Sequence, residues 1–70
     1  DEGRRHAFVA EVKWSREPVS RTLLDDLRAR VARESAFAGM TVTLALISRA
    51  GFRGRRPVGK DERLIDLGAM

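Results

Sequence analysis

Two strand-like segments separated by one helical segment are the feature that most constrains the fold of this chain. Ala7–Trp14 (AFVAEVKW) and Thr41–Ser48 (TVTLALIS) are rich in apolar and β-branched residues, which is typical of β-strands. The connection between them contains one helix, which fits a crossover between parallel strands and not a hairpin. We therefore expect an α/β fold with a strand-helix-strand (βαβ) core.

The connecting helix is predicted from the spacing of its leucines and from a start signal. Ser20 is a good N-cap residue, so we expect the helix to begin at Arg21. Gly39 is expected to terminate it. The side chains predicted to form its buried stripe are Leu23, Leu24, Leu27 and Val31.

The remaining segments are expected to complete a small sheet. Thr41–Ser48 is apolar on both faces, as in a central strand of a parallel sheet. Arg49–Lys60 contains three glycines, a proline and five basic residues and is predicted to be a loop, and Arg63–Leu67 is predicted to be a short final strand. Trp14 falls on a wholly apolar face of the first strand, so we expect it in the core.

Glu11 and Lys13 form the most informative pair of charged residues. They are two residues apart on the first predicted strand, so their side chains share one face, about 6–7 Å apart along the strand. A carboxylate at this spacing can hold a divalent cation while the ammonium faces the same water or phosphate. The alternative interpretation is a solvent-facing ion pair near a sheet edge.

A second group of candidate residues lies in the predicted glycine-rich loop. Arginine side chains suit phosphate oxygens because the guanidinium group can donate two parallel hydrogen bonds. The loop follows the carboxyl end of a strand in a βαβ unit, where ligands bind in open α/β sheets. The alternative is a solvated loop, with Phe52 as a buried anchor. The predicted nucleic-acid-binding residues are Arg49, Arg53, Arg55 and Arg56.

Composition excludes several kinds of chemistry. The 70 residues include no cysteine and one histidine, which rules out disulfides and cysteine-ligated metals and argues against a histidine cluster for a metal. The net charge of +4 is compatible with a nucleic-acid partner. Because no apolar run approaches the ~20 residues of a membrane span, we expect a cytoplasmic protein without a membrane partner.

The sequence also resembles a known family. Val9–Trp14 (VAEVKW) is similar to the E-x-K half of the PD-(D/E)XK, or restriction-endonuclease-like, superfamily motif. Ile47–Phe52 (ISRAGF) resembles the (F/I)-S-x-x-G-F stretch of one group within it, the C-terminal domain of certain prokaryotic AAA-type ATPases. Leu64–Leu67 looks like the last strand of that family, so the resemblance covers residues 7 to 67.

The resemblance implies a Mg²⁺-dependent phosphodiesterase geometry. Glu11 would be a catalytic metal ligand, and Lys13 would be the catalytic lysine that orients or stabilises the attacking water. The family's other acidic ligand lies on a preceding strand, which we expect upstream of this chain, because Asp1–Arg5 resembles the turn before the E-x-K strand. Residues 1–70 would then be one small domain, the C-terminal part of a larger PD-(D/E)XK-like domain.

Three functional hypotheses follow from the sequence. The first is a Mg²⁺-dependent nuclease-type domain that acts on DNA, attached to an ATPase domain and inactive as the isolated chain. The second is a catalytically inactive interaction or regulatory module that retains the fold. The third is a purely electrostatic nucleic-acid binder that needs no metal. Exposed sheet edges can also pair with another copy of the chain, so a homo-oligomer is a further prediction.

Overall fold

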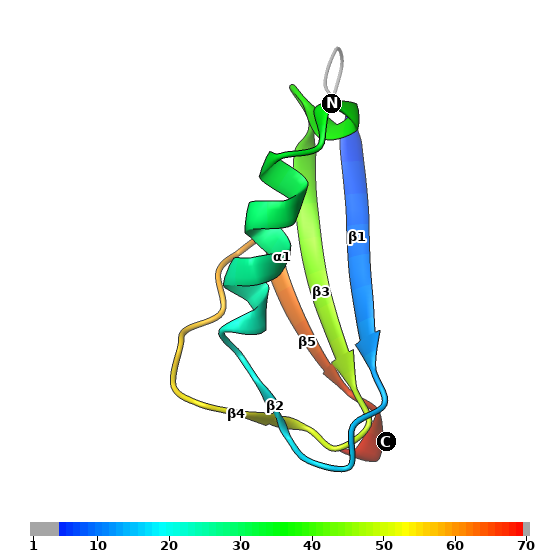
Figure 1. The fold of residues 1–70 in the computed structure, drawn as a ribbon, viewed down its shortest axis with the longest axis vertical. Helices are drawn as coiled ribbons and strands as arrows, with labels where there is room; N and C mark the ends of the chain where they lie inside the picture. Colours follow the sequence, from blue (N-terminus) through cyan, green and yellow to red (C-terminus); the bar gives the residue numbers. More distant parts are fainter. Residues whose placement is uncertain (1–4, 70) are drawn as a thin grey trace.

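The computed structural model describes residues 5–69 as a small α/β domain with one helix on a parallel sheet (Figure 1). The expected turn at Asp1–Arg5 lies almost wholly outside the described residues. The main sheet has three strands in the order β1-β3-β5, and a two-stranded ladder joins β2 to β4. The strands are β1 (His6–Lys13), β2 (Val19–Ser20), β3 (Thr41–Ser48), β4 (Phe52–Arg53) and β5 (Glu62–Asp66).

The predicted βαβ core is confirmed. Strands β1 and β3 pair in parallel along their whole length, from His6 with Thr41 to Lys13 with Ser48. The helix α1 (Leu23–Ala32) lies between them in the chain and contacts β3. The final strand is also confirmed, since β5 pairs in parallel with β3. Two short 3₁₀ helices, Ser35–Phe37 and Leu67–Ala69, follow α1 and β5.

The hydrophobic core lies between α1 and one face of the sheet. The predicted leucine stripe is confirmed, because Leu24 and Leu27 of α1 are buried against Leu44 and Leu46 of β3. Strand β3 is central, and five of its eight residues are buried: Thr43, Leu44, Ala45, Leu46 and Ser48. Partly buried residues packed around this cluster include Val9, Leu23, Val31, Val42, Phe52 and Leu64.

The helix begins later than predicted. Its N-cap is Thr22 and not Ser20, because Ser20 belongs to β2 and pairs with Arg53 of β4. The Ser20 hydroxyl instead accepts a hydrogen bond from the Thr22 amide at 3.3 Å. The helix also ends earlier, at Ala32, and Gly39 lies beyond the first 3₁₀ helix with a positive φ of 77°.

The short β2-β4 ladder was not predicted. The Val19 amide donates to the Gly51 carbonyl at 3.0 Å, and the Arg21 amide donates to the Arg53 carbonyl at 3.1 Å. In Figure 1 these two strands cross the end of the molecule below α1. The first part of the predicted loop Arg49–Lys60 is therefore hydrogen-bonded to the segment that precedes the helix.

The expectation that Trp14 lies in the core is wrong. Its side chain is 67% exposed, because α1 covers the sheet face that carries Val9 and Glu11. The opposite face of β1 points away from the helix, and Trp14 follows the end of that strand. Among residues 5–69, no helix is both long and apolar enough to cross a membrane.

We predict that Leu24→Ala lowers the free energy of unfolding by about 2–5 kcal/mol, because it leaves a cavity at a fully buried position. A domain of this size has roughly 3–5 kcal/mol in total, so the variant should be largely unfolded. Urea unfolding followed by circular dichroism measures the change. Val58→Ala, at a 39% exposed position, is the control and should change stability by less than about 0.5 kcal/mol. Equal stability of the two variants would contradict the assigned core.

Candidate functional site

The structure brings Glu11 and Lys13 together on one face of β1. Lys13 Nζ lies 2.9 Å from Glu11 Oε2, and both side chains are partly exposed. Their shared face, predicted from the strand period, is the face on which α1 packs. The pair is therefore an ion pair at the border between the helix and the edge strand.

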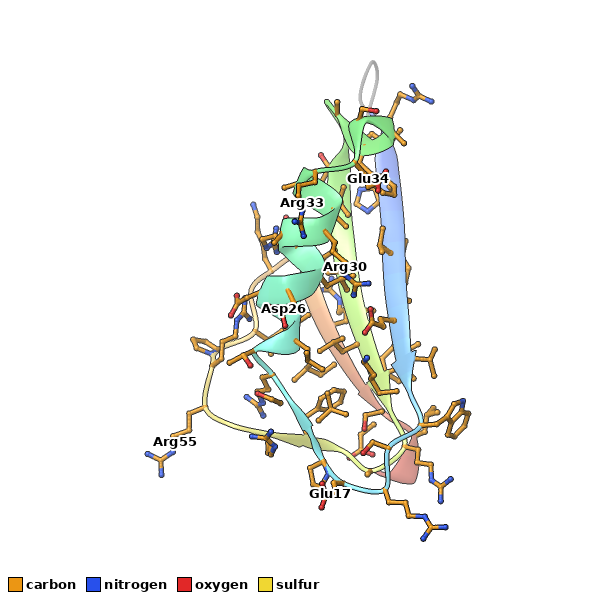
Figure 2. All side chains as sticks on the ribbon, viewed as in Figure 1. Glu17, Asp26, Arg30, Arg33, Glu34 and Arg55 are labelled. Atoms are coloured by element: carbon orange, nitrogen blue, oxygen red, sulfur yellow. The ribbon has the colours of Figure 1, made fainter. Side chains whose placement is uncertain are left out.

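Arg30 of α1 is a third member of this cluster that the sequence analysis did not include. Its Nη2 donates a hydrogen bond to Glu11 Oε1, so each carboxylate oxygen has a cationic partner. Figure 2 shows Arg30 extending from the helix toward β1. Arg30 lies next to Val31, at the edge of the apolar stripe of the helix. A cation at the edge of such a stripe is the sequence signal that could have indicated a contact between Arg30 and the sheet.

The two cations keep Glu11 ionised. The hydrogen bond from Lys13, followed by the one from Arg30, lowers the pKa of the Glu11 carboxyl, against an opposing effect of burial. At neutral pH the cluster thus has one negative and two positive groups. Its net positive charge suits an anionic ligand such as a phosphate group.

The donor set within residues 5–69 does not by itself fit a divalent cation. Mg²⁺ is usually held by one or two carboxylates together with waters or substrate phosphates. Here Glu11 is the single carboxylate of the cluster, and both of its oxygens accept from cations. No group of three or more His, Cys, Asp or Glu side chains comes together in the described part of the chain. A metal site would need a second acidic ligand from outside residues 5–69.

The four predicted arginines are not gathered in one place. Arg49 follows β3 at the carboxyl edge of the sheet, and its guanidinium carbon lies 6.0 Å from the centre of the Trp14 ring. Arg53 lies on β4 and is exposed, as is Arg55 in the following loop. Figure 2 shows Arg55 pointing away from the body of the molecule. Arg49 is thus the loop arginine that directly follows the strand paired with β1.

Arg56 differs from the other three because it is bound to carboxylates. Its guanidinium donates to Glu62 Oε1 at 2.8 Å and Oε2 at 3.0 Å, and to Asp25 of α1 at 2.9 Å. These contacts raise the pKa of Arg56, first through Glu62 and then through Asp25. The residue joins the loop to the helix, and its place among the phosphate-binding residues remains a prediction.

Glu62 is the centre of this second charged cluster and was not singled out in the sequence. It is 4% exposed and also accepts hydrogen bonds from Arg28 at 2.9 Å and from the Gly59 amide at 2.8 Å. The bonds from Arg56 are the main cause of a lowered pKa, with smaller contributions from Gly59 and Arg28, and the value falls to about 2. A buried carboxylate with this many donors holds the β4-β5 connection against α1.

The Ser-x-x-Gly-Phe stretch has a structural role in this chain. The Ser48 hydroxyl accepts a hydrogen bond from the Ala50 amide at 3.2 Å, which stabilises a turn after β3. Gly51 has a positive φ of 84°, and a Cβ there would lie 3.0 Å from Asp66 Oδ2. Phe52 packs against the core and is the predicted anchor of the loop. The stretch therefore turns the chain from β3 into β4.

A surface groove of about 580 Å³ lies elsewhere on the molecule, at the carboxyl end of α1 and the start of β3. Its lining includes Arg28, Val31, Phe37 and Thr41. None of the candidate site residues predicted from the sequence lines it. The chemistry-bearing groups are instead on the open surface beside β1.

Comparisons of the chain with known protein families, with curated proteins and with solved structures found no match. The candidate site therefore rests on the geometry of residues 5–69 and on the motif resemblance.

We predict that Glu62→Gln flattens the dependence of stability on pH under acidic conditions. The pKa of Glu62 is about 2 in the folded protein and 4.5 for an unperturbed carboxyl. Its contribution to stability is therefore complete above about pH 4.5 and is lost as the pH falls toward 2. Urea midpoints measured from pH 7 down to pH 2 should fall steeply for the parent protein and less steeply for the variant, which is also less stable at pH 7.

Glu17→Gln is the matched control, because Glu17 is exposed and its replacement removes the same charge. This variant should follow the pH profile of the parent protein. Parallel profiles for Glu62→Gln and the parent protein would show that the Glu62 cluster does not contribute to acid stability.

Proposed function

We propose that this chain is part of a nucleic-acid-processing domain of the Mg²⁺-dependent nuclease type, in which Glu11 and Lys13 form the E-x-K half of the active site. The observation that carries the proposal is the cluster of Lys13, Glu11 and Arg30, with Lys13 Nζ 2.9 Å from Glu11 Oε2. An acid and a lysine on alternate positions of one strand are the arrangement that the resemblance to the PD-(D/E)XK superfamily implies.

The residues of the cluster have separate roles in this proposal. Lys13 and Arg30 offer positive charge to the phosphate group on which negative charge develops during phosphodiester cleavage. Glu11 holds both cations in place through its two oxygens. To ligate Mg²⁺, Glu11 would have to exchange at least one of these two partners for the ion, which with a second acidic ligand outside residues 5–69 would supply an activated water.

The carboxyl edge of the sheet supports a nucleic-acid substrate. Lys13 is paired with Ser48 in the sheet, so Arg49 begins the basic loop next to the end of β1. Arg53 and Arg55 continue the loop as exposed cations. A backbone with phosphates at regular intervals could contact both the cluster and this loop, which is a common source of affinity in nucleic-acid binding.

A catalytically inactive binding module is a second candidate. It is favoured by one specific observation, namely that both oxygens of Glu11 already accept from cations. Such a cluster can bind a phosphate without a metal. In that case the chain would keep the fold and the affinity for an anionic partner while lacking cleavage.

We predict that cleavage of DNA depends on Glu11 and Lys13. The assay uses supercoiled, linear and branched DNA with Mg²⁺ or Mn²⁺, on the 70-residue chain and on any longer natural polypeptide that contains it. Cleavage should require the second acidic ligand, and Glu11→Gln or Lys13→Ala should each abolish it. Arg33→Ala, which removes an exposed cation at the C-cap of α1, is the control and should retain cleavage. Cleavage that survives Lys13→Ala would remove the E-x-K strand from the mechanism, and DNA binding without cleavage by the longer polypeptide would favour the second candidate.

We also predict that the basic loop contributes to the salt dependence of DNA binding. Each phosphate contact adds about 0.9 to the slope of log K against log salt concentration. The double variant Arg53→Ala, Arg55→Ala should therefore reduce the slope by roughly 2. Fluorescence anisotropy with labelled duplex DNA in EDTA measures this. The double variant Arg5→Ala, Arg33→Ala removes the same charge from exposed positions outside the loop and should change the slope little. Equal slopes for both double variants would mean that the loop makes no specific phosphate contacts.

A further inference from the structure

The sheet face opposite α1 has no covering helix or strand within residues 5–69. It carries polar side chains toward the start of β1 and β3, where His6 and Thr43 are hydrogen-bonded at 3.0 Å, and apolar side chains toward the carboxyl ends of the strands. Helix α1 packs on the face that carries Leu44 and Leu46. Residues that are paired in the sheet point to the same side of it. The strand pairs that do not include Leu44 or Leu46 and alternate with them therefore give the residues of the opposite face. Its apolar residues, here called the open sheet face, are Phe8, Ala10 and Val12 of β1, Ala45 and Ile47 of β3, and Ile65 of β5.

The large side chains of this face are exposed to an unusual degree. Phe8 is 61% exposed, Val12 is 48% exposed and Ile65 is 38% exposed. Trp14, the only tryptophan of the chain, continues this apolar area past the end of β1. Single exposed apolar residues are common, but a contiguous group on one face marks an interaction surface.

The direction of the strands indicates what kind of element covers the face. All pairs in the main sheet are parallel. All-parallel sheets occur almost only with helices on both faces. Here one face has α1, and the second face presents the apolar residues of the open sheet face. An α-helix of about 18 residues would match the ~26 Å length of an eight-residue strand.

The charges around the face indicate the chemistry of that helix. Arg63 of β5 lies on this side of the sheet, paired with Ala45, and its guanidinium is held by the carbonyls of Lys60 and Glu62 at 2.6 and 2.8 Å. Arg49 lies against Trp14 at the carboxyl edge. None of the strand residues on this side is acidic. A second copy would bring the same cations to a two-fold interface without a counter-charge, whereas acidic residues on a partner would complement them.

We propose that the open sheet face binds an amphipathic α-helix of a partner polypeptide, which places leucine-like residues on Phe8, Val12 and Ile65 and acidic residues beside Arg49 and Arg63. This binding surface is on the opposite side of the sheet from Glu11. Of the residues proposed for the nuclease function, this surface uses Arg49 alone.

Trp14 is a built-in reporter for the test, because its exposed indole would become shielded when a helix covers the face. The probe is a synthetic helical peptide of about 18 residues with a leucine face flanked by glutamates, and its twin carries lysines in place of the glutamates. Titration of the 70-residue chain with the glutamate peptide should shift Trp14 emission to shorter wavelength and reduce acrylamide quenching. The lysine twin should bind at least about tenfold more weakly.

Two substitutions locate the site. Phe8→Thr should weaken binding of the glutamate peptide about tenfold or more, while Val58→Thr, at a 39% exposed position outside the sheet, should not. Circular dichroism verifies that both variants are folded. Arg63→Glu should reduce the preference for the glutamate peptide over the lysine twin, and this result does not depend on loss of any apolar contact.

Four results would overturn the proposal. One is an absence of any Trp14 shift with the glutamate peptide up to about 1 mM. Another is equal affinity for the two peptides. A concentration-dependent shift of the chain alone, with a dimer in sedimentation equilibrium, would identify a second copy as the occupant. A shift produced by phosphatidylserine vesicles and not by the peptide would identify a lipid surface.

Discussion

The parallel pairing of β3 with strands on both sides is the constraint on which the rest of the structure depends. Because β3 is hydrogen-bonded to β1 and β5 at once, its carboxyl end, the end of β1 and the end of β5 meet at one edge of the sheet. This arrangement puts Lys13 beside Ser48 and starts the basic loop next to the E-x-K strand. The leucines of β3 in turn fix the position of α1, and with it the position of Arg30.

The main elements of this fold could be predicted because they depend on local patterns. The alternation in β1, the doubly apolar β3 and the leucine stripe of α1 are each visible in a short window of sequence. The β2-β4 ladder could not be predicted in this way, since it consists of two residues on each strand and is stabilised by tertiary pairing of Val19 with Phe52. The same pairing displaced the predicted helix start, because tertiary contacts override a local capping preference.

The candidate site was predictable for the two residues that share a strand and not for their partners. Strand periodicity places Glu11 and Lys13 on one side, but it does not say which side the helix covers. Because the helix covers the face that carries Glu11, Trp14 is exposed and Arg30 of the helix contacts Glu11. Glu62 was missed for a similar reason: a single acid at the start of a short strand gives no local sign that Arg28 of α1 and Arg56 of the preceding loop will both bind it.

The strand pairs also have a consequence for the folding rate. They join His6 to Thr41, Val19 to Phe52 and Leu44 to Glu62, so each requires closure of a long chain segment, and within residues 5–69 no hairpin provides a local start. Loop-closure entropy must be overcome before any sheet contact becomes favourable. For a small domain this topology implies a high relative contact order and slow folding, so the apolar strands stay accessible to other chains for longer.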